Sequence, residues 1–230
     1  VLVLSPSSYG KVTRRALARH LYLDTAPVLL GFTVLAALIS LVLTRIVVVT
    51  AISYGLSRYA LEMVIRVLVL ELIPLTAALF VAMRCTIPNG TQLALLRQSG
   101  HLARLSHAGA DPIRVELLPR AVAGVFACIT LAALSCVVAL VLAYLGVYGF
   151  SLAGLPSYTR MFGHVFAPAV TLVFVIKTVL FSLAVALIPM AAGLYDTGER
   201  TQPDSELGGL ARMFAVLLLI EIGSLVGNYY

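Results

Sequence analysis

The stretch LELIPLTAALFVAMR (residues 70–84) decides the fold, because it sets a carboxylate, Glu71, and a proline, Pro74, inside an apolar run. A basic and polar connection follows, and the chain returns to apolar sequence through ADPIRVELLPR (residues 110–120). A charged group in hydrocarbon is costly, so an acid in such a run normally faces a bundle interior or a cavity. The pattern indicates two membrane helices joined on one side of the membrane, with a buried acid in the first.

The composition agrees with a membrane protein. Of the 230 residues, 61% are hydrophobic and 11% are charged, and the mean hydropathy is +1.04. Soluble domains are about half apolar and about a quarter charged, because their surfaces must be solvated. A soluble fold is therefore excluded, and the sequence predicts an all-α polytopic membrane protein that forms a single domain over residues 1–230.

Five segments are long and apolar enough to cross a bilayer, which takes about 20 mainly apolar residues. All five are rich in Leu, Ala and Val, and none shows the alternating pattern of membrane barrel strands. The predicted spans are residues 26–50, 59–83, 117–144, 165–194 and 207–228.

The segment before the first span, residues 1–24, is expected to include an interfacial helix. Its apolar residues Val12, Ala16, Leu17 and Leu21 recur at helical spacing, and its basic residues lie largely on other faces. Such a helix suits the headgroup layer on the cytoplasmic side. The alternative is an ordinary basic flank of the first span.

The basic residues predict the orientation, because Lys and Arg are enriched in cytoplasmic connections. Five spans place the basic N-terminal segment, the connection between spans two and three, and the connection between spans four and five on one side. These hold Lys11, Arg14, Arg15, Arg19, Arg84, Arg97, Arg104, Arg114, Arg120, Arg200 and Arg212. The opposite side has only Arg58 and Arg160. The N-terminus is therefore expected in the cytoplasm and the C-terminus outside it, and the net charge of +6 implies no nucleic-acid partner.

Motifs for nucleotide binding, catalysis and metal binding are missing. Gly10-Lys11 lacks the rest of a phosphate-binding GxxxxGK[ST] loop, so any ATP-driven step needs a separate ATPase. Lys177 and Ser182 share a span, but their spacing places them on different sides of a helix, which argues against a catalytic dyad. The three cysteines have no metal-binding spacing, and no structural disulfide is expected among them.

Several ionisable residues lie inside the predicted spans: Arg45, Glu62, Arg66, Glu71, Lys177 and Glu221. Glu62 and Arg66 are four residues apart and can pair along one helix face. Glu71 lies deeper, and Pro74 removes a backbone hydrogen bond beside it, which tends to kink the helix. We expect Glu71 to be functional and to pair with Arg66, Arg45 or Lys177, although a purely structural ion pair is the alternative.

The connection over residues 84–116 is expected to form the cytoplasmic coupling loop. Asn89-Gly90, Ser99-Gly100 and Asp111-Pro112 predict turns, and short helices are possible at residues 92–97 and 101–108. Asp111 can cap the helix that leads into span three. A short helix between spans gives an ATPase a rigid contact; a plain connecting loop is the alternative.

Three motifs resemble the MlaE/YrbE permease family, the membrane subunits of MCE-type lipid-transport ABC systems. ELIP, AAL and Arg84 within residues 71–84 are similar to the family's ELGP…ALL…GR. GADPIR and PR within residues 109–120 are similar to G-x-DP-[IL]-R…PR. KTVLF and GLYD within residues 177–196 are similar to K-S-x-x-F…GYD. The match extends from about Arg19 to the C-terminus.

The resemblance implies an MlaE-type permease fold: an interfacial helix and five spans, paired with a second permease chain as a homodimer or a heterodimer. ABC ATPase subunits would dock on the coupling loop and hold ATP and Mg²⁺, while the permease needs no cofactor. A periplasmic MCE protein would sit above, a STAS-domain subunit is possible, and the location would be the bacterial inner membrane. Such systems serve outer membrane lipid asymmetry.

The resemblance also assigns two sets of residues. Those expected at the lipid cavity are Glu71, Arg66, Tyr54, Leu70 and Pro74. Those expected to couple to the ATPase are Gln92, Arg97, His101, Arg104, His107, Asp111 and Arg114.

The chain departs from the family in two places. Leu70 stands where the family has an arginine before the motif glutamate, and Ile73 replaces a glycine. The family's coupling loop is acidic, whereas residues 100–112 here carry Arg104 and two histidines. Either the partner ATPase has changed to match, or this chain is one half of a heterodimer whose other half couples conventionally.

These observations predict a non-catalytic permease subunit that moves phospholipid between the inner membrane and a periplasmic MCE protein. One alternative is an ATP-independent, proton-coupled secondary transporter in which Glu71 and Lys177 relay protons. Another is a membrane scaffold, in which replacement of Glu71 would be harmless. Lipid species and transport direction have no sequence signal.

Overall fold

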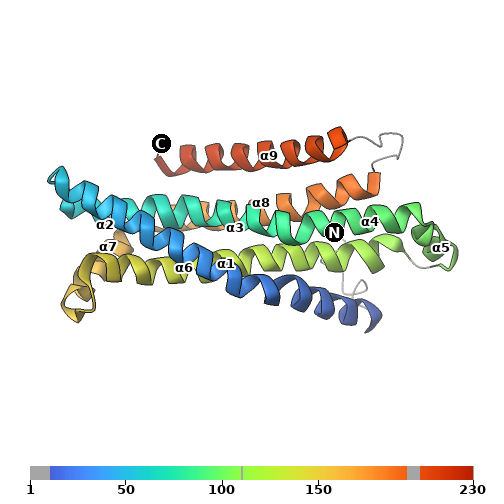
Figure 1. The fold of residues 1–230 in the computed structure, drawn as a ribbon, viewed down its shortest axis with the longest axis horizontal. Coiled ribbons are helices and arrows are strands. Elements are labelled where there is room, and N and C mark those ends of the chain that lie inside the picture. The colour runs from blue at the N-terminus through green and yellow to red at the C-terminus, as the bar shows by residue number, and fades with distance from the viewer. Residues whose placement is uncertain (1–10, 110, 196–202, 230) are drawn as a thin grey trace.

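The computed structural model describes residues 11–109, 111–195 and 203–229, and every regular element in those ranges is a helix. The long helices run side by side along one axis as an elongated bundle (Figure 1). The elements of the first half are α1 (Lys11–Ser53), α2 (Ser57–Val64), η3 (Ile65–Leu72), α3 (Ile73–Val81), η4 (Ala82–Thr86), α4 (Ile87–Gln98) and α5 (His101–His107). Those of the second half are η5 (Ile113–Leu117), α6 (Leu118–Tyr148), η6 (Leu152–Gly154), α7 (Leu155–Val165), α8 (Pro168–Tyr195) and α9 (Pro203–Tyr229).

The all-α prediction and the five spans are confirmed. Within the described residues, five helical stretches have the length and composition to cross a membrane: Leu17–Ser53, Tyr59–Gln98, Ile113–Tyr148, Pro168–Leu194 and Gly209–Asn228. The chain is a multi-pass membrane protein.

The N-terminal segment is helical, as expected, but it continues into the first span without a break. Helix α1 has 43 residues and runs straight through Pro27. At 1.5 Å per residue such a helix is about 65 Å long, roughly twice the hydrocarbon thickness of about 30 Å. Its first turns therefore extend beyond the apolar layer, and their position in the headgroup layer stays a prediction. Residues 1–10 of the segment lie outside the described residues.

The coupling loop predicted over residues 84–116 is much shorter in the structure. The second span continues as helix to Gln98, so the expected turn at Asn89-Gly90 is wrong, and residues 92–97 belong to the end of α4. Asn89 and Gly90 are buried where α4 packs on α8. This tertiary contact outweighs the weak helix propensity of an Asn-Gly pair. The expected short helix after Gly100 is present as α5.

Three prolines inside the spans each follow a π-helical segment. Pro74 follows η3, Pro88 follows η4 and Pro119 follows η5. In each case the residue before the proline donates its backbone N–H five residues back: Ile73 to Leu68, Ile87 to Ala82 and Leu118 to Ile113. A proline has no N–H to donate, so the widened turn accommodates it without ending the helix.

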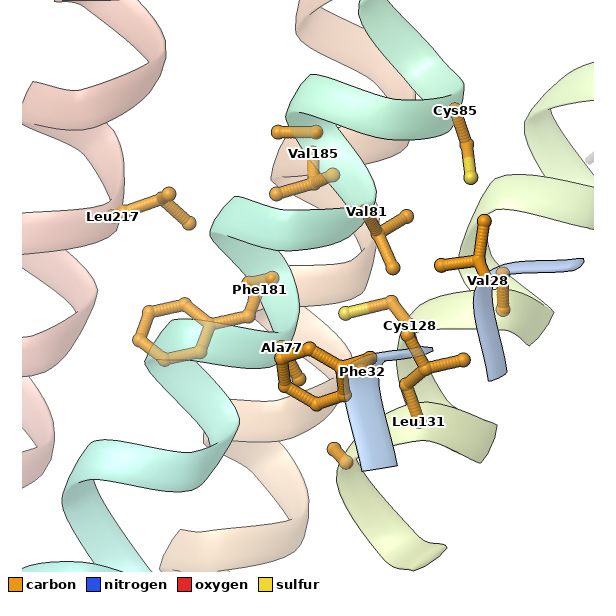
Figure 2. Packing of buried hydrophobic residues seen from close by; sticks show 14 of the residues in the cluster. Val28, Phe32, Ala77, Val81, Cys85, Cys128, Leu131, Phe181, Val185 and Leu217 are labelled. Carbon is orange, nitrogen blue, oxygen red and sulfur yellow. The ribbon is translucent and has the colours of Figure 1, made fainter. Parts of the chain in front are cut away.

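The core lies where small residues allow the helices to approach closely. Figure 2 shows Phe32 and Leu131 from α1 and α6 packed against Ala77, with Phe181 and Leu217 adding the faces of α8 and α9. Small side chains at such contacts are the usual basis of packing between membrane helices. The cysteines contribute to this packing as buried thiols: Cys85, Cys128 and Cys136.

Helix α7 is an element that sequence reasoning missed. The fourth span was expected to begin at residue 165, but Val165 ends α7 and the span begins at Pro168. Val165 is fully buried, and Tyr158 donates its hydroxyl to the carbonyl of Leu140 at 3.0 Å. These contacts hold α7 against the bundle at the end opposite α5 (Figure 1).

Gly90 and Gly193 mark a close crossing of α4 and α8 that leaves no room for a side chain. A Cβ on Gly90 would lie 2.6 Å from the carbonyl oxygen of Pro189. We expect Gly90→Ala to destabilise the chain by about 1–3 kcal/mol, since backbone has to move. Thermal unfolding in lipid nanodiscs measures the effect. Gly31→Ala on α1, where the added Cβ meets nothing within 4 Å, is the matched control and should leave stability nearly unchanged.

Candidate functional site: a buried charge cluster

Lys177 of α8 lies inside the bundle, and only 1% of its side chain is exposed. Its ammonium forms an ion pair with Glu71 of η3 and a second one, at 2.8 Å, with Glu221 of α9. The nitrogen also donates to the backbone carbonyl of Leu70 at 3.3 Å. The Phe181 ring lies 5.7 Å from the ammonium and adds a weaker cation–π contact. Three helices thus meet at one buried cation.

The carbonyl of Leu70 can accept from Lys177 because of Pro74. In an ordinary helix the N–H of residue 74 would donate to the carbonyl of residue 70, but a proline has no N–H. A buried carbonyl without a partner is costly, and the lysine satisfies it. Pro74 therefore leaves a free backbone acceptor at Leu70 for Lys177, in addition to its tendency to kink the helix.

The two carboxylates lie at the edge of the cluster. The side chains of Glu71 and Glu221 are 13% and 14% exposed, so both are more accessible than the lysine. The amide of Asn228 on α9 reaches Glu71 Oε1 at 3.5 Å, at the limit of a hydrogen bond. Glu221, Ser224 and Asn228 are three, four and seven residues apart and share one face of α9.

The structure selects one of the three partners expected for Glu71. Lys177 is that partner, whereas Arg66 pairs with Glu62 at 3.0 Å, as the four-residue spacing predicted. Arg45 lies on an exposed face of α1. The sequence marked Glu221 as an ionisable residue inside a span but did not connect it with Lys177, and it gave no signal for Asn228. Only the packing of α9 on α8 brings them together.

The residues expected at the lipid cavity do not gather around one pocket. Leu70 and Pro74 are buried in the bundle, and Arg66 is occupied by Glu62. Tyr54 is 77% exposed at the end of α1. Of the five, Glu71 contributes its side chain to the charge cluster and Leu70 contributes its backbone carbonyl.

An apolar groove of about 150 Å³ lies between α1 and α3, adjacent in sequence to Glu71. Phe32 and Phe80 form its aromatic floor, with ring centroids 4.9 Å apart. Its other lining residues are Leu35, Ala36, Ile39, Leu72, Ile73, Thr76, Leu79 and Met83. The groove is almost purely hydrocarbon in character, so it suits an acyl chain better than a polar solute.

The residues expected to couple to an ATPase gather at the α5 end of the bundle (Figure 1). Gly100 and Gly109, with φ of 71° and 78°, bound α5 and let the chain turn sharply on each side. Gln92, Arg104, His107 and Asp111 are exposed, and Arg97 and His101 are half-buried. Asp111 accepts from the backbone N–H of Ile113 at 3.0 Å, so it caps the next helix as predicted.

Ion pairs fix this end of the chain. Glu116 pairs with the buried Arg120 at 2.8 Å and lies 3.8 Å from His101 on α5. Asp111 pairs with Arg114 at 3.4 Å. Arg104 donates to the backbone carbonyl of Ser99 at the end of α4, at 2.9 Å. Glu116 therefore lies between α5 and the start of the third span and forms an ion pair with both when His101 is protonated, an arrangement that the sequence alone did not show.

Ser182 forms its hydrogen bond within α8 and not with Lys177. Its hydroxyl donates to the carbonyl of Val179 at 2.8 Å, while Lys177 is occupied by Glu71 and Glu221. The Lys177–Ser182 dyad considered from the sequence is therefore not assembled.

The fold and the site define an all-helical, multi-pass membrane protein with a buried cation that is shared by three helices. The family model for the MlaE permease matches residues 17–226, so the chain belongs to the MlaE permease family. Members are membrane permease subunits of lipid transport. No match was found among curated proteins.

Replacement of Lys177 tests how much the charge cluster contributes to the stability of the folded chain. Lys177→Gln leaves Glu71 and Glu221 without a cation, and breaking a buried ion pair in this way costs about 3–5 kcal/mol. We expect a large drop in the thermal unfolding temperature in nanodiscs.

The comparison variant is Arg66→Gln, which removes a more accessible pair and should cost no more than about 1 kcal/mol. If Lys177→Gln and Arg66→Gln lowered the unfolding temperature equally, the three-helix cluster would not stabilise the bundle more than the Glu62–Arg66 pair does.

Proposed function

We propose that the chain is the membrane-spanning subunit of an ATP-driven phospholipid transporter that exchanges lipid between the inner membrane and a periplasmic MCE protein. It has no catalytic role of its own: ATP and Mg²⁺ are held by ABC ATPase subunits. The N-terminus is cytoplasmic and the C-terminus periplasmic. The observation that carries this proposal is the α5 segment, a short and largely exposed basic helix that contacts the end of α4 and the start of the third span at one end of the bundle.

The α5 segment suits a contact with an ATPase for two reasons. Its hold on the third span through Glu116 and on α4 through Arg104 means that a push on α5 moves two spans. Its charge is positive, with Arg104 and His107 exposed, so the docking groove of the ATPase is expected to be acidic. Charge complementarity of this kind selects the right partner and suppresses wrong ones.

The lipid is proposed to lie against α1 and α3. Its acyl chain occupies the apolar groove above Phe32 and Phe80, and its headgroup lies toward Tyr54, Arg66 and Glu71. Leu70 and Pro74 support this site from within the bundle rather than touching the lipid, because both are buried.

A second permease chain is proposed to complete the cavity. Helices α1 and α9 are the least covered of the five spans within the described chain, so one of them is available for another chain. The second chain is a copy of this one, or a related permease in a heterodimer. A STAS-domain subunit is a further possible partner, and co-purification of the chain with its ATPase tests for it.

An ATP-independent, proton-coupled transporter is the second candidate function, and the Lys177–Glu71–Glu221 cluster is the observation that favours it. Buried acids paired with a lysine are the usual elements of proton relays in membranes. Lipid transfer measured in vesicles separates the two. Transport that needs the ATPase and survives collapse of the proton gradient supports the ATP-driven reading, whereas the opposite result supports the secondary transporter.

Charge reversal on α5 tests the coupling proposal. We expect Arg104→Glu to weaken co-purification of the ATPase by about tenfold or more, because a like charge now faces an acidic groove. Arg160→Glu makes the same charge change on an exposed residue of α7, at the opposite end of the bundle, and should retain the ATPase. Loss in both variants, or in neither, would argue against docking at α5.

The groove is tested by photo-crosslinking. A photoreactive amino acid at Met83, which lines the groove, should capture phospholipid acyl chains. The same probe at Leu219, which is 67% exposed on α9, reports ordinary contact with the bilayer. Filling the groove with Ala36→Phe should reduce capture at Met83 and leave capture at Leu219 unchanged. Equal capture before and after filling would mean that bulk lipid, not a bound lipid, is detected.

A further inference from the structure

The buried cluster is not balanced in charge. It contains one cation, Lys177, and two carboxylates, Glu71 and Glu221, all within ion-pair distance. With both acids ionised the cluster would carry one net negative charge among apolar helices. Each of the other acids with a described ion pair has a cation of its own: Glu62 has Arg66 at 3.0 Å, Asp111 has Arg114 at 3.4 Å, and Glu116 has Arg120 at 2.8 Å.

No further cation compensates this surplus among the described residues. The ammonium is supplied by α8 and the carboxylates by η3 and α9, which also contributes the neutral Asn228. Arg66, on the same helical run as Glu71, is taken up by Glu62. An isolated ionised carboxylate in hydrocarbon is too costly to persist, and such a group becomes neutral instead.

Polar atoms around Glu221 also lack partners. Ser224, only 6% exposed, has a buried hydroxyl without a hydrogen-bond partner among the described residues, and the same is true of Asn228 Oδ1. Both lie on the face of α9 that carries Glu221. Glu221 Oε2 faces the ammonium at 2.8 Å but lacks a well-directed hydrogen bond. Two of these atoms, Glu221 Oε2 and Asn228 Oδ1, are oxygens that can only accept, and neither has a hydrogen-bond donor among the described residues.

We propose that the Glu71–Lys177–Glu221 cluster is a proton-binding site that holds one proton, shared by the two carboxylates, in the packed state of the bundle. Both carboxylates lie against a single ammonium, so full ionisation would leave one negative charge unmatched in a largely buried site, and one shared proton removes that charge. The bound proton makes the cluster neutral and turns one acid into a hydrogen-bond donor. Separation of α9 from α8 would hydrate the acids and release the proton to water. This inference concerns the side chains alone and holds whichever energy source drives lipid movement.

Infrared spectroscopy of the full chain in nanodiscs tests the proposal. A protonated carboxylic acid has a carbonyl stretch well separated from that of a carboxylate, and ¹³C-glutamate labelling assigns it to Glu. At neutral pH we expect a signal from one protonated Glu in the wild-type chain. Glu71→Gln and Glu221→Gln should each abolish it, because either change leaves one acid matched to Lys177.

Two more variants sharpen the test. Glu62→Gln, in the matched pair with Arg66, should leave the signal intact. Lys177→Gln should raise it about twofold, because both acids then need a proton. Because Lys177→Gln is expected to lose much of its stability, the Glu71→Gln and Glu221→Gln variants, which keep the side-chain shape, decide the matter once thermal unfolding shows that they are folded.

The contrary outcomes are distinct. A wild-type spectrum without a protonated Glu would overturn the proposal and indicate that a metal cation or a lipid ammonium balances the charge. A signal that survives in both Glu71→Gln and Glu221→Gln would also overturn it, because the proton would then reside elsewhere. Loss of ATPase binding or of lipid transport in these variants would bear on the proposed function and leave the spectroscopic result unaffected.

Discussion

The ammonium of Lys177 has to be satisfied in a part of the bundle that water does not reach, and much of the structure follows from that requirement. It needs oxygens from several directions, and it obtains them from η3 and α9 on either side of α8. Because a lone charge in hydrocarbon is expelled or neutralised, the three helices are bound to one arrangement. Apolar contacts surround the ammonium, but they are less directional than the ion pairs. The ion pairs therefore fix the positions of the three helices along one another more strictly than the apolar contacts do.

Prolines inside the spans leave backbone carbonyl groups without their usual N–H partner in the helix. Each of Pro74, Pro88 and Pro119 follows a widened helical turn, and the helix continues through all three. Irregular backbone at membrane depth is tolerated only where protein satisfies it, and Lys177 does so at Leu70. The same sequence feature therefore shapes the helix and creates a hydrogen-bond acceptor for the buried cation.

The two ends of the bundle differ in a way that matches a transport subunit. At one end α5 is short, basic and tied to the third span through Glu116. At the other end α7 packs on the bundle through Val165 and Tyr158. The charge cluster of Lys177, Glu71 and Glu221 joins η3, α8 and α9 between these two ends.

The sequence by itself determined the class of protein, the five spans, the pairing of Glu62 with Arg66 and the presence of an acid, Glu71, inside the second span, because hydropathy, spacing and the cost of buried charge are local properties. It also carried the motifs of the MlaE permease family. Only the tertiary structure decided that the second span runs on to Gln98, because that depends on Gly90 packing against Pro189. Only the tertiary structure chose Lys177 as the partner of Glu71 and added Glu221, because these residues come together through the packing of helices far apart in the chain, and periodicity within one helix cannot reveal which faces of other helices will meet it.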